Sequence, residues 1–248
     1  MKVYGLIGYP LTHSFSKKYF TEKFEKQGLT GYRYENFSIA SIDKLAGILA
    51  ANPDIAGLNV TIPYKESVIH LLNEKTDVVK KIGACNCIRI DGKRLKGFNT
   101  DTIGFEKTLL TKLKPHHKKA LILGTGGAAK AVEFVLNKLG IKVKYVSRKP
   151  SIRHFSYEQV TPKIIADYTL IVNSTPLGMY PNIVQAPPIP YEALTSQHLL
   201  YDLIYNPPKT LFLQKGEQYG ADSMNGYDML VIQAEESWKI WNMEIIAD

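Results

Sequence analysis

The sequence predicts an α/β protein of two domains in which short strands alternate with helices. Three observations support this class. The first hundred residues alternate apolar runs of strand length with segments of helical periodicity, and a second series of the same kind begins at Ala120. A glycine-rich turn follows the first strand of that second series. We therefore expect an N-terminal α/β domain with a mostly parallel sheet and a C-terminal, doubly wound α/β domain.

Three strands and three helices are expected in the first 73 residues. The strands are KVYGLIG, YRYENFSI and IAGLNVTI, at residues 2–8, 32–39 and 55–62. The helices are expected at residues 14–27, 41–51 and 64–73. In the first helix Phe20 and Phe24 lie four residues apart and Gly28 provides a stop signal, while Ser41 is a suitable N-cap for the second.

The segment CNCIRIDGKRLKGFNT, residues 85–100, predicts a β-hairpin. Asp91-Gly92 is a strong turn dipeptide between two runs of strand character. Cys85 and Cys87 are two residues apart on the expected strand, so they should share a face and pack together. A disulfide between them would be badly strained.

A helix over residues 102–112 should start the second half of the chain. The strands of this second half are expected in ALILG, KVKYVS, TLIVN and LLYDLIY. Its last helix is expected to run from Gly226 to Trp241. Leu230, Ala234, Trp238 and Trp241 form one stripe of that helix. We expect one domain at residues 1–101, with the C-terminal helix 226–248 packing back toward it, and a second domain at residues 102–225.

Composition narrows the classes of function. The 248 residues are 45% hydrophobic and carry a formal charge of +8, which favours an anionic partner. The positive charges are scattered rather than clustered, so no nucleic-acid partner is expected. No apolar run has the roughly 18 residues of a membrane span, and with only two cysteines a cytoplasmic location is the default expectation. The six histidines lack the spacing of metal ligands, so no metal is expected.

The segment Gly124-Thr125-Gly126-Gly127-Ala128-Ala129 fits the dinucleotide-binding pattern G-x-G-x-x-A. It follows an expected strand and opens an expected helix, which is the context that this pattern requires. Glycine permits a tight turn and lets the backbone approach a pyrophosphate, which the free N–H groups of the helix N-terminus then bind. The second domain is therefore expected to be Rossmann-like. The alternative is a tight turn without a ligand.

The strand after the glycine loop indicates which dinucleotide is bound. A site for NAD normally has Asp or Glu about 20 residues after the loop, to bind the ribose 2′-OH. Here the strand runs into Ser147, Arg148 and Lys149, without an acid. Arg148 and Lys149 could bind a 2′-phosphate, so we predict NADP as the cofactor. The alternative is that both are solvated surface charges.

Several further segments, taken together, resemble the shikimate dehydrogenase family. They are Ser14-x-Ser16, Asn59-Val60-Thr61-Ile62-Pro63-Tyr64-Lys65, Gly83-Ala84-Cys85-Asn86, Asn99-Thr100-Asp101, Asn173-Ser174-Thr175-Pro176-Leu177-Gly178-Met179, and Gly226 with Gln233. They follow the family's order and span nearly the whole chain. The resemblance implies a substrate domain first, a cofactor domain second, and NADPH-dependent reduction of 3-dehydroshikimate to shikimate in aromatic amino-acid synthesis.

Lys65 and Asp101 are the expected catalytic residues. Carbonyl reduction needs a proton for the developing alkoxide, which a lysine can donate while a carboxylate fixes it and binds a ring hydroxyl. Lys65 is expected on the first turn of a helix and Asp101 at the end of the hairpin, so both could reach the rim of one sheet. In the family the matching residues are the catalytic pair. The alternatives are a solvated lysine and a helix N-cap.

The other expected contacts come from both halves of the chain. Ser14 and Ser16 resemble the family's carboxylate-binding serines, and helix capping is their alternative. Partners for the ring hydroxyls are expected to be Thr61, Asn86, Tyr205 and Gln233. Contacts on the nicotinamide side are expected from Thr175, Leu203 and Gly226, although a helix boundary also explains that glycine. Cys87 and Asp228 depart from the family's pattern, since threonine and glycine are common there.

Rival functions remain open. A dehydrogenase that prefers quinate, or accepts both acids, is the nearest, and a non-catalytic NADP-binding regulatory module is another. A short-chain dehydrogenase would use Tyr-x-x-x-Lys, but Tyr19 to Lys23 precedes the cofactor loop and Tyr145 to Lys149 lies in a strand. The partner is expected to be the small-molecule substrate, without a membrane, in a monomer or homodimer.

Overall fold

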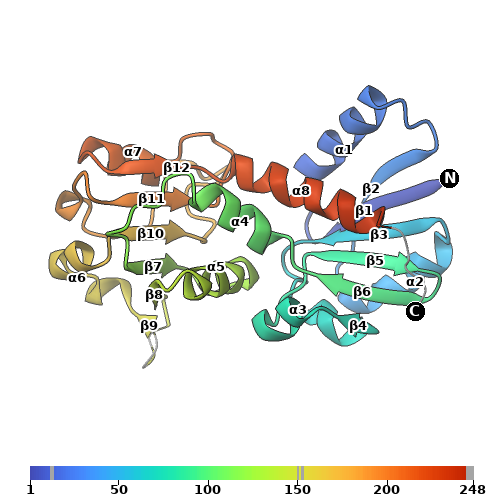
Figure 1. Cartoon of the computed structure of the whole chain (residues 1–248), viewed down its shortest axis with the longest axis horizontal. Helices are drawn as coiled ribbons and strands as arrows, with labels where there is room; N and C mark the ends of the chain where they lie inside the picture. The colour runs from blue at the N-terminus through green and yellow to red at the C-terminus, as the bar shows by residue number, and fades with distance from the viewer. Residues whose placement is uncertain (12–13, 150, 152–153, 244–248) are drawn as a thin grey trace. The chain divides into compact units, whose positions relative to one another are not determined.

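The structure is a computed structural model that describes residues 1–11, 14–149, 151 and 154–243 (Figure 1). The chain divides into two compact units, each with its own sheet. Unit 1 comprises Met1–Thr100 and the residues from Ala234 onward, and unit 2 comprises Asp101–Gln233. Helix α8 (Tyr227–Trp241) contributes its first half to unit 2 and its second half to unit 1. The predicted α/β fold class is confirmed.

Unit 1 is built on a six-stranded sheet with the order β2-β1-β3-β5-β6-β4. Its strands are β1 (Lys2–Gly8), β2 (Tyr32–Ser38), β3 (Ile55–Val60), β4 (Glu74–Lys75), β5 (Cys87–Asp91) and β6 (Arg94–Phe98). Strand β1 pairs in parallel with β2 and β3, while β5 runs antiparallel to β3 and β6. The predicted parallel strands and the predicted hairpin are therefore both present. The helices of this unit are α1 (Phe15–Lys26), α2 (Leu45–Ala51) and α3 (Asp77–Ile82), with 3₁₀ turns η1 (Ile42–Lys44) and η2 (Ser67–Leu71).

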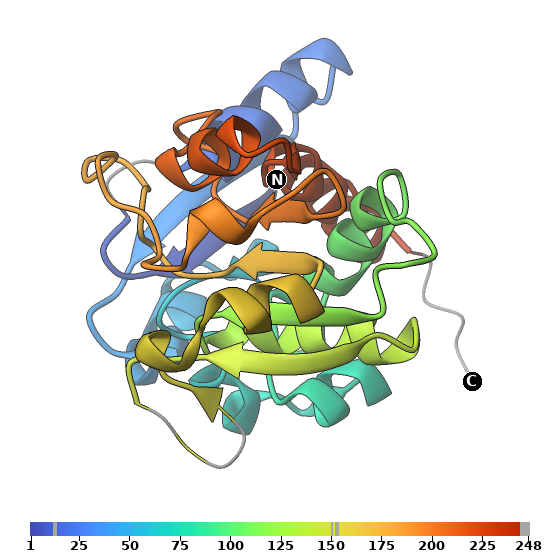
Figure 2. The ribbon, with the colours of Figure 1, turned by 90° about the vertical axis from the view of Figure 1, so that its left-hand side faces the viewer.

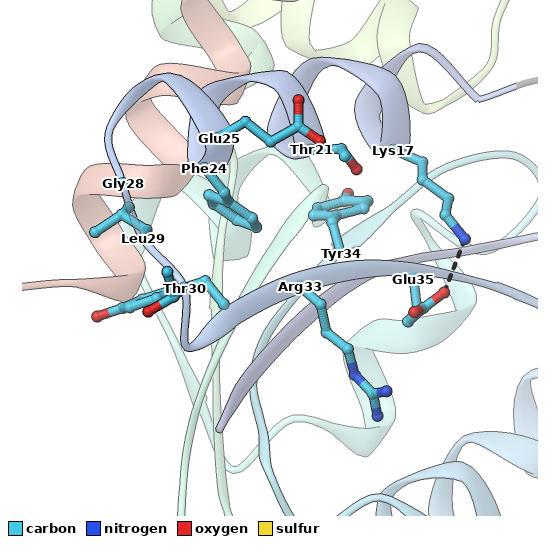
Figure 3. A pocket seen from close by; sticks show the side chains of 11 residues that line it. Lys17, Thr21, Phe24, Glu25, Gly28, Leu29, Thr30, Arg33, Tyr34 and Glu35 are labelled. Atoms are coloured by element: carbon cyan, nitrogen blue, oxygen red, sulfur yellow. Dashed lines mark hydrogen bonds and ion pairs between the residues drawn. The ribbon is translucent and has the colours of Figure 1, made fainter.

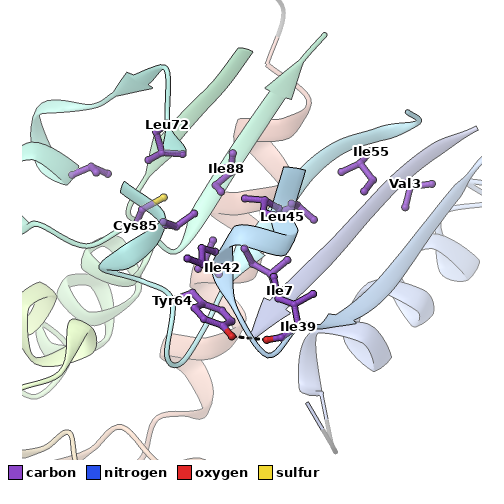
Figure 4. Packing of buried hydrophobic residues seen from close by; sticks show 14 residues of the cluster. Val3, Ile7, Ile39, Ile42, Leu45, Ile55, Tyr64, Leu72, Cys85 and Ile88 are labelled. Carbon is purple, nitrogen blue, oxygen red and sulfur yellow. Dashed lines mark hydrogen bonds between the residues drawn. The ribbon is translucent and has the colours of Figure 1, made fainter. Parts of the chain in front are cut away.

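Alternating side chains of the unit 1 strands form a hydrophobic cluster on each face of the sheet. One cluster joins Val3, Ile7 and Leu58 to residues of η1, α2 and η2 (Figure 4). In that view Tyr64 points toward Ile39, and its hydroxyl donates to the Ile39 carbonyl at 2.5 Å. The other cluster is aromatic and includes Tyr4, Phe20, Phe24, Tyr34 and Trp241. The predicted stripe of α8 thus packs its Trp241 into the core of unit 1.

Unit 2 has the doubly wound arrangement. Its strands are β7 (Lys119–Leu123), β8 (Lys142–Val146), β9 (His154–Phe155), β10 (Leu170–Asn173), β11 (Leu199–Asp202) and β12 (Asp222–Met224). They form a parallel sheet in the order β12-β11-β10-β7-β8-β9. This order reverses between β7 and β10, and in such sheets ligands bind at the carboxyl ends of the strands near that switch point. The Rossmann-like prediction is confirmed.

Helices cover both faces of the unit 2 sheet (Figures 1 and 2). They are α4 (Asp101–Leu109), α5 (Gly127–Lys138), α6 (Pro162–Asp167) and α7 (Leu211–Gln218), with 3₁₀ turns η3 (Tyr157–Gln159) and η4 (Tyr191–Ala193). Helices α4 and α5 contribute Phe105 and Val132 to one core, together with Met229 of α8. Helices α6 and α7 contribute Ile165 and Phe212 to the core on the opposite face.

Three local predictions are wrong. Residues 64–73 form only the short 3₁₀ turn η2, so Lys65 lies in a turn rather than on a helix. The strand expected in LLYDLIY ends at Asp202, which leaves Tyr205 in the following loop. Cys85 and Cys87 are buried and form no disulfide, but their side chains belong to the cores on opposite faces, because Cys85 precedes β5 and is outside the strand alternation. They remain in contact, since the Cys85 thiol donates to the Cys87 carbonyl at 3.3 Å.

Candidate active site

The two predicted serines lie where β1 leads into α1. Ser14 is the N-cap of α1, and its hydroxyl accepts a hydrogen bond from the Lys17 amide at 3.2 Å. Capping is therefore one role of Ser14. Ser16 is 8% exposed, and its side chain forms a hydrogen bond with the Tyr34 hydroxyl. Burial raises the pKa of Tyr34, and this hydrogen bond opposes that rise. Both residues belong to the segment that follows β1, at the start of α1.

Thr61 and Lys65 lie beyond the carboxyl end of β3, the strand next to β1. The Thr61 amide donates to the Ile7 carbonyl at 2.9 Å, so the chain continues beside β1 for one residue after the strand ends. The backbone then turns, and the Lys65 carbonyl accepts a hydrogen bond from the Cys85 amide at 2.7 Å. Because Cys85 directly precedes Asn86, this bond holds the backbone of Lys65 close to that of Asn86.

Asn86 connects three segments of unit 1. It is 2% exposed, and its carbonyl accepts from the Val60 amide at 2.8 Å. Its side-chain oxygen accepts from the Thr100 amide at 2.6 Å, and its side-chain nitrogen donates to the Thr100 hydroxyl at 2.9 Å. These bonds fix the backbone immediately before Asp101, which is buried and is the first residue of α4.

The structure thus brings five predicted residues of unit 1 to one edge of its sheet. They follow β1 and β3 or precede β5, and they are Ser14, Ser16, Thr61, Lys65 and Asn86. Together they offer hydroxyl groups, an amide and an ammonium group. Such a set can bind a small polar molecule that carries hydroxyl and carboxylate groups.

A hollow elsewhere in unit 1 is not made of these residues. It has a volume of about 370 Å³ and lies between α1 and β2 (Figure 3). Phe24, Tyr34 and Arg33 line it, and an ion pair between Lys17 and Glu35, 2.9 Å long, lies at its side. The predicted substrate residues are absent from its lining, so we assign no chemistry to it.

In unit 2 the glycine loop lies at the switch point of the sheet. Gly124 has a φ of +102°, and a Cβ there would lie 2.9 Å from the Ser174 hydroxyl oxygen, so both conformation and space favour glycine. Its amide donates to the Val146 carbonyl at 2.9 Å, which holds the loop against the end of β8. Thr125 and Gly126 are exposed, and Gly127 begins α5, with Ala128 in its first turn. The open N-terminus of α5 therefore fits a pyrophosphate.

The basic residues follow β8 directly beside this loop. The Ser147 amide donates to the Phe155 carbonyl at 2.9 Å, and the Ser147 hydroxyl accepts from the Lys149 amide at 3.2 Å. Arg148 and Lys149 are exposed in the resulting turn. Because the Gly124 amide binds the Val146 carbonyl, the turn and the glycine loop are neighbours, and their donors fit a cofactor with a 2′-phosphate.

The residues predicted on the nicotinamide side occupy loops at the same edge of the unit 2 sheet. Thr175 follows β10 and is half-buried, and Leu203 follows β11. Gly226 is buried, and a Cβ there would overlap the Leu203 carbonyl, so the backbone of Leu203 itself accounts for the glycine. Tyr205 is half-buried, and burial raises the pKa of its hydroxyl. Gln233 is 7% exposed and donates to the Leu230 carbonyl at 2.9 Å.

Sequence reasoning missed the side chains that hold these loops. Asn173 and Asp202 end neighbouring strands, are both fully buried, and are joined by a hydrogen bond of 3.0 Å. Burial raises the pKa of Asp202 to about 6, and hydrogen bonds from Thr210, Ile204 and Asn173 oppose that rise. The signals in the sequence are Asn173 at the start of the segment 173–179 and an acid at the end of an apolar run, and neither reveals that the two side chains are partners.

Neither a metal site nor a membrane-spanning helix is found in the described part of the chain. Its His, Cys, Asp and Glu side chains form no group of three or more that could hold a metal ion. None of its helices is long and apolar enough to cross a membrane.

The strand order of unit 2, its glycine loop and the basic turn after β8 define a dinucleotide-binding α/β protein, to which unit 1 adds a polar site. The model of the shikimate dehydrogenase substrate binding domain matches residues 6–88. A shikimate dehydrogenase (NADP(+)) from Halothermothrix orenii is 36% identical, over 97% of this chain and 90% of the relative. The chain belongs to the shikimate dehydrogenase family.

Solved structures agree with this assignment. The crystal structure of shikimate dehydrogenase 1 from Peptoclostridium difficile has a TM-score of 0.86 and 37% identity, over 100% of this chain and 94% of that chain. Shikimate 5-dehydrogenase from Thermus thermophilus, solved in complex with NADP(H) and shikimate, has a TM-score of 0.85 and 29% identity, over 98% of this chain and 94% of that chain.

Proposed function

We propose that the protein is an NADP-dependent oxidoreductase that reversibly reduces 3-dehydroshikimate to shikimate, a step of the shikimate pathway to chorismate and the aromatic amino acids. The observation that carries this proposal is the similarity to shikimate dehydrogenases over 97% of the chain, which includes both the polar edge of unit 1 and the glycine loop of unit 2. The domain that binds substrate is proposed to be residues 1–101 with the helix from 226, and the cofactor domain residues 102–225.

Substrate would be held by polar groups that the fold already orients. Ser14 and Ser16 are proposed to bind the ring carboxylate, because two hydroxyls can do so without a buried cation. The ring hydroxyls are proposed to bind Thr61, Asn86, Tyr205 and Gln233. Asn86 suits this task because its side chain is buried and already held by Thr100, so it would lose little conformational entropy on binding.

Lys65 and Asp101 are proposed to move the proton. The NADPH cofactor, when bound, supplies the hydride that reduces the substrate carbonyl. The Lys65 ammonium donates a proton to the oxygen of that carbonyl as negative charge develops on it, and accepts the proton back in the reverse reaction. The Asp101 carboxylate orients the lysine and accepts a hydrogen bond from a ring hydroxyl.

The cofactor would be held by backbone donors and by the basic turn. Gly124, Thr125, Gly126, Gly127 and Ala128 are proposed to bind the pyrophosphate, and Ser147, Arg148 and Lys149 the 2′-phosphate. Thr175, Leu203 and Gly226 are proposed to contact the nicotinamide half. The protein is proposed to act as a monomer or homodimer in the cytoplasm, and its two buried cysteines, which form no disulfide, suit a reducing compartment.

The test is an absorbance assay at about 340 nm with shikimate or quinate as substrate and NADP⁺ or NAD⁺ as cofactor. The proposal expects the highest kcat/KM for shikimate with NADP⁺. A higher value for quinate would favour the rival substrate, and a higher value for NAD⁺ would contradict the cofactor. Binding of NADP⁺ without turnover of either acid would instead support a regulatory module.

A further inference from the structure

Two buried polar side chains join neighbouring strand ends in unit 2. Asn173 ends β10 and Asp202 ends β11, and they are register partners in the parallel ladder. Both are 0% exposed. The Asn173 side-chain nitrogen donates to one oxygen of the Asp202 carboxylate at 3.0 Å. The two strands are therefore joined by their side chains at the edge where the loops begin.

From Asn173 the hydrogen bonds continue into the loop that follows β10. Its side-chain oxygen accepts from the Thr175 amide at 3.0 Å and from the Thr175 hydroxyl at 2.6 Å. The Thr175 hydroxyl in turn accepts from the Leu177 amide at 3.3 Å. On the other side, the Thr175 methyl group lies close to Gly124 of the glycine loop. The orientation of Thr175 is thus set by Asn173.

From Asp202 the hydrogen bonds continue into the loop that follows β11. The carboxylate oxygen that binds Asn173 also accepts from the Ile204 amide at 3.0 Å. The other oxygen accepts from the Thr210 hydroxyl at 2.6 Å, at the N-cap of α7. The Ile204 carbonyl accepts from the Gly226 amide at 3.0 Å, which adds the start of α8 to the same assembly. One carboxylate therefore fixes both ends of the loop 203–210.

Stabilisation of the fold does not by itself explain why residue 202 is a carboxylate. In the described part of the chain its hydrogen-bond partners are neutral donors, and a fully buried charge without a cation is costly. Burial raises the pKa of Asp202 despite the three hydrogen bonds, so the ionised group remains unfavourable in the folded protein. What a carboxylate does better than a neutral side chain is to accept from several donors at once.

We propose that Asp202 is a positioning residue for hydride transfer, which acts through Asn173 on Thr175 and through Ile204 on the loop with Leu203 and Tyr205. The inference rests on the proposed function, because that function assigns these loops to the nicotinamide half of the cofactor. The adenosine half is assigned to the basic turn after β8, which Asp202 does not contact.

The test separates the two halves of the cofactor. Asp202→Asn removes one acceptor, Thr210→Val removes the matching donor, and Thr210→Ser is the control because it keeps the hydroxyl. Each purified full-length variant is assayed for shikimate oxidation with NADP⁺, and titrated calorimetrically with adenosine 2′,5′-bisphosphate, which carries only the adenosine half. Thermal unfolding shows that each variant is folded at the assay temperature.

The proposal expects Asp202→Asn and Thr210→Val to lower kcat by about 5- to 10²-fold, since small displacements of reacting groups have effects of this size. Their affinity for adenosine 2′,5′-bisphosphate should stay within about twofold, and Thr210→Ser should resemble the wild type. A kcat decrease below fivefold, or an equal loss of adenosine 2′,5′-bisphosphate binding, would overturn the positioning role. If Asp202→Asn does not fold, the comparison of Thr210→Val with Thr210→Ser tests the positioning role. A wild-type protein without shikimate oxidation would instead overturn the proposed function.

Discussion

Lowering the pH from 7 to 5 should stabilise the wild-type protein more than the Asp202→Asn variant. Burial raises the pKa of the Asp202 carboxyl from 3.8 to about 6. Between these two values the folded protein binds more protons at this site than the unfolded chain does, so the contribution of Asp202 to stability falls as the pH rises through this window. The asparagine variant lacks the titrating group and shares all the others.

The shift gives the size of the effect. A difference of about two pKa units corresponds to about 3 kcal/mol between the limits at low and high pH. Of this, about 1.3 kcal/mol falls between pH 7 and pH 5, because the carboxyl of the folded protein becomes largely protonated there while the unfolded chain stays ionised. Tyr191, whose raised pKa partly reflects Asp202, stays protonated throughout and does not contribute.

The measurement is urea denaturation of both proteins at pH 5, 6 and 7 and constant ionic strength, followed by circular dichroism. The free energy of unfolding of the wild type, minus that of the variant, should increase by about 1.3 kcal/mol from pH 7 to pH 5. Comparing the two proteins at each pH cancels the other titrating groups. A difference that stays constant, or that decreases toward pH 5, would refute the account of a carboxylate destabilised by burial.

Three further predictions concern the proton donor, the cofactor and the core. Lys65→Ala should lower kcat by about 10²–10⁴-fold without changing the melting temperature. The control variant Lys18→Ala, on an exposed face of α1, should keep full activity. Near-normal turnover of Lys65→Ala would disprove the proton-donor role. Arg148→Ala should reduce the preference for NADP⁺ over NAD⁺ in kcat/KM by about 10- to 10²-fold, and an unchanged ratio would show that Arg148 does not bind the 2′-phosphate. Trp241→Phe should lower the free energy of urea unfolding by about 1–3 kcal/mol, because it leaves the buried Ile88 carbonyl without its 3.0 Å hydrogen bond; an unchanged value would contradict this.

The sequence patterns predicted those parts of the fold that depend on the residue types within one short segment. The glycine loop needs φ > 0 at Gly124 and an open helix start, both of which its residue types specify. The hairpin after Cys87 follows from Asp91-Gly92, and Gly92 has the expected positive φ of 58°. The helix expected over residues 14–27 is present as α1, and Ser14, for which capping was the alternative role, is its N-cap.

The parts that were missed depend on tertiary contacts. Helix α6 is only six residues long, and its place is set by Ile165 packing into a core that distant strands build. At residues 64–73 the spacing of Val68 and Leu72 suggests a helix, but the Tyr64 side chain reaches the Ile39 carbonyl and the chain forms only a 3₁₀ turn. Of the three partners of Asp202, Ile204 is local, but Asn173 lies 29 residues before it and Thr210 lies 8 after it, beyond any local pattern.

The two units fix their candidate residues by the same device, a buried asparagine next to a strand end. In unit 1 Asn86 binds both the amide and the hydroxyl of Thr100, which precedes Asp101. In unit 2 Asn173 binds both the amide and the hydroxyl of Thr175. An amide side chain is suited to this because its oxygen accepts from the loop amide while its nitrogen donates, to the Thr100 hydroxyl in unit 1 and to the Asp202 carboxylate in unit 2. A loop held in this way keeps its polar groups in place before a ligand arrives, so less ordering entropy opposes binding.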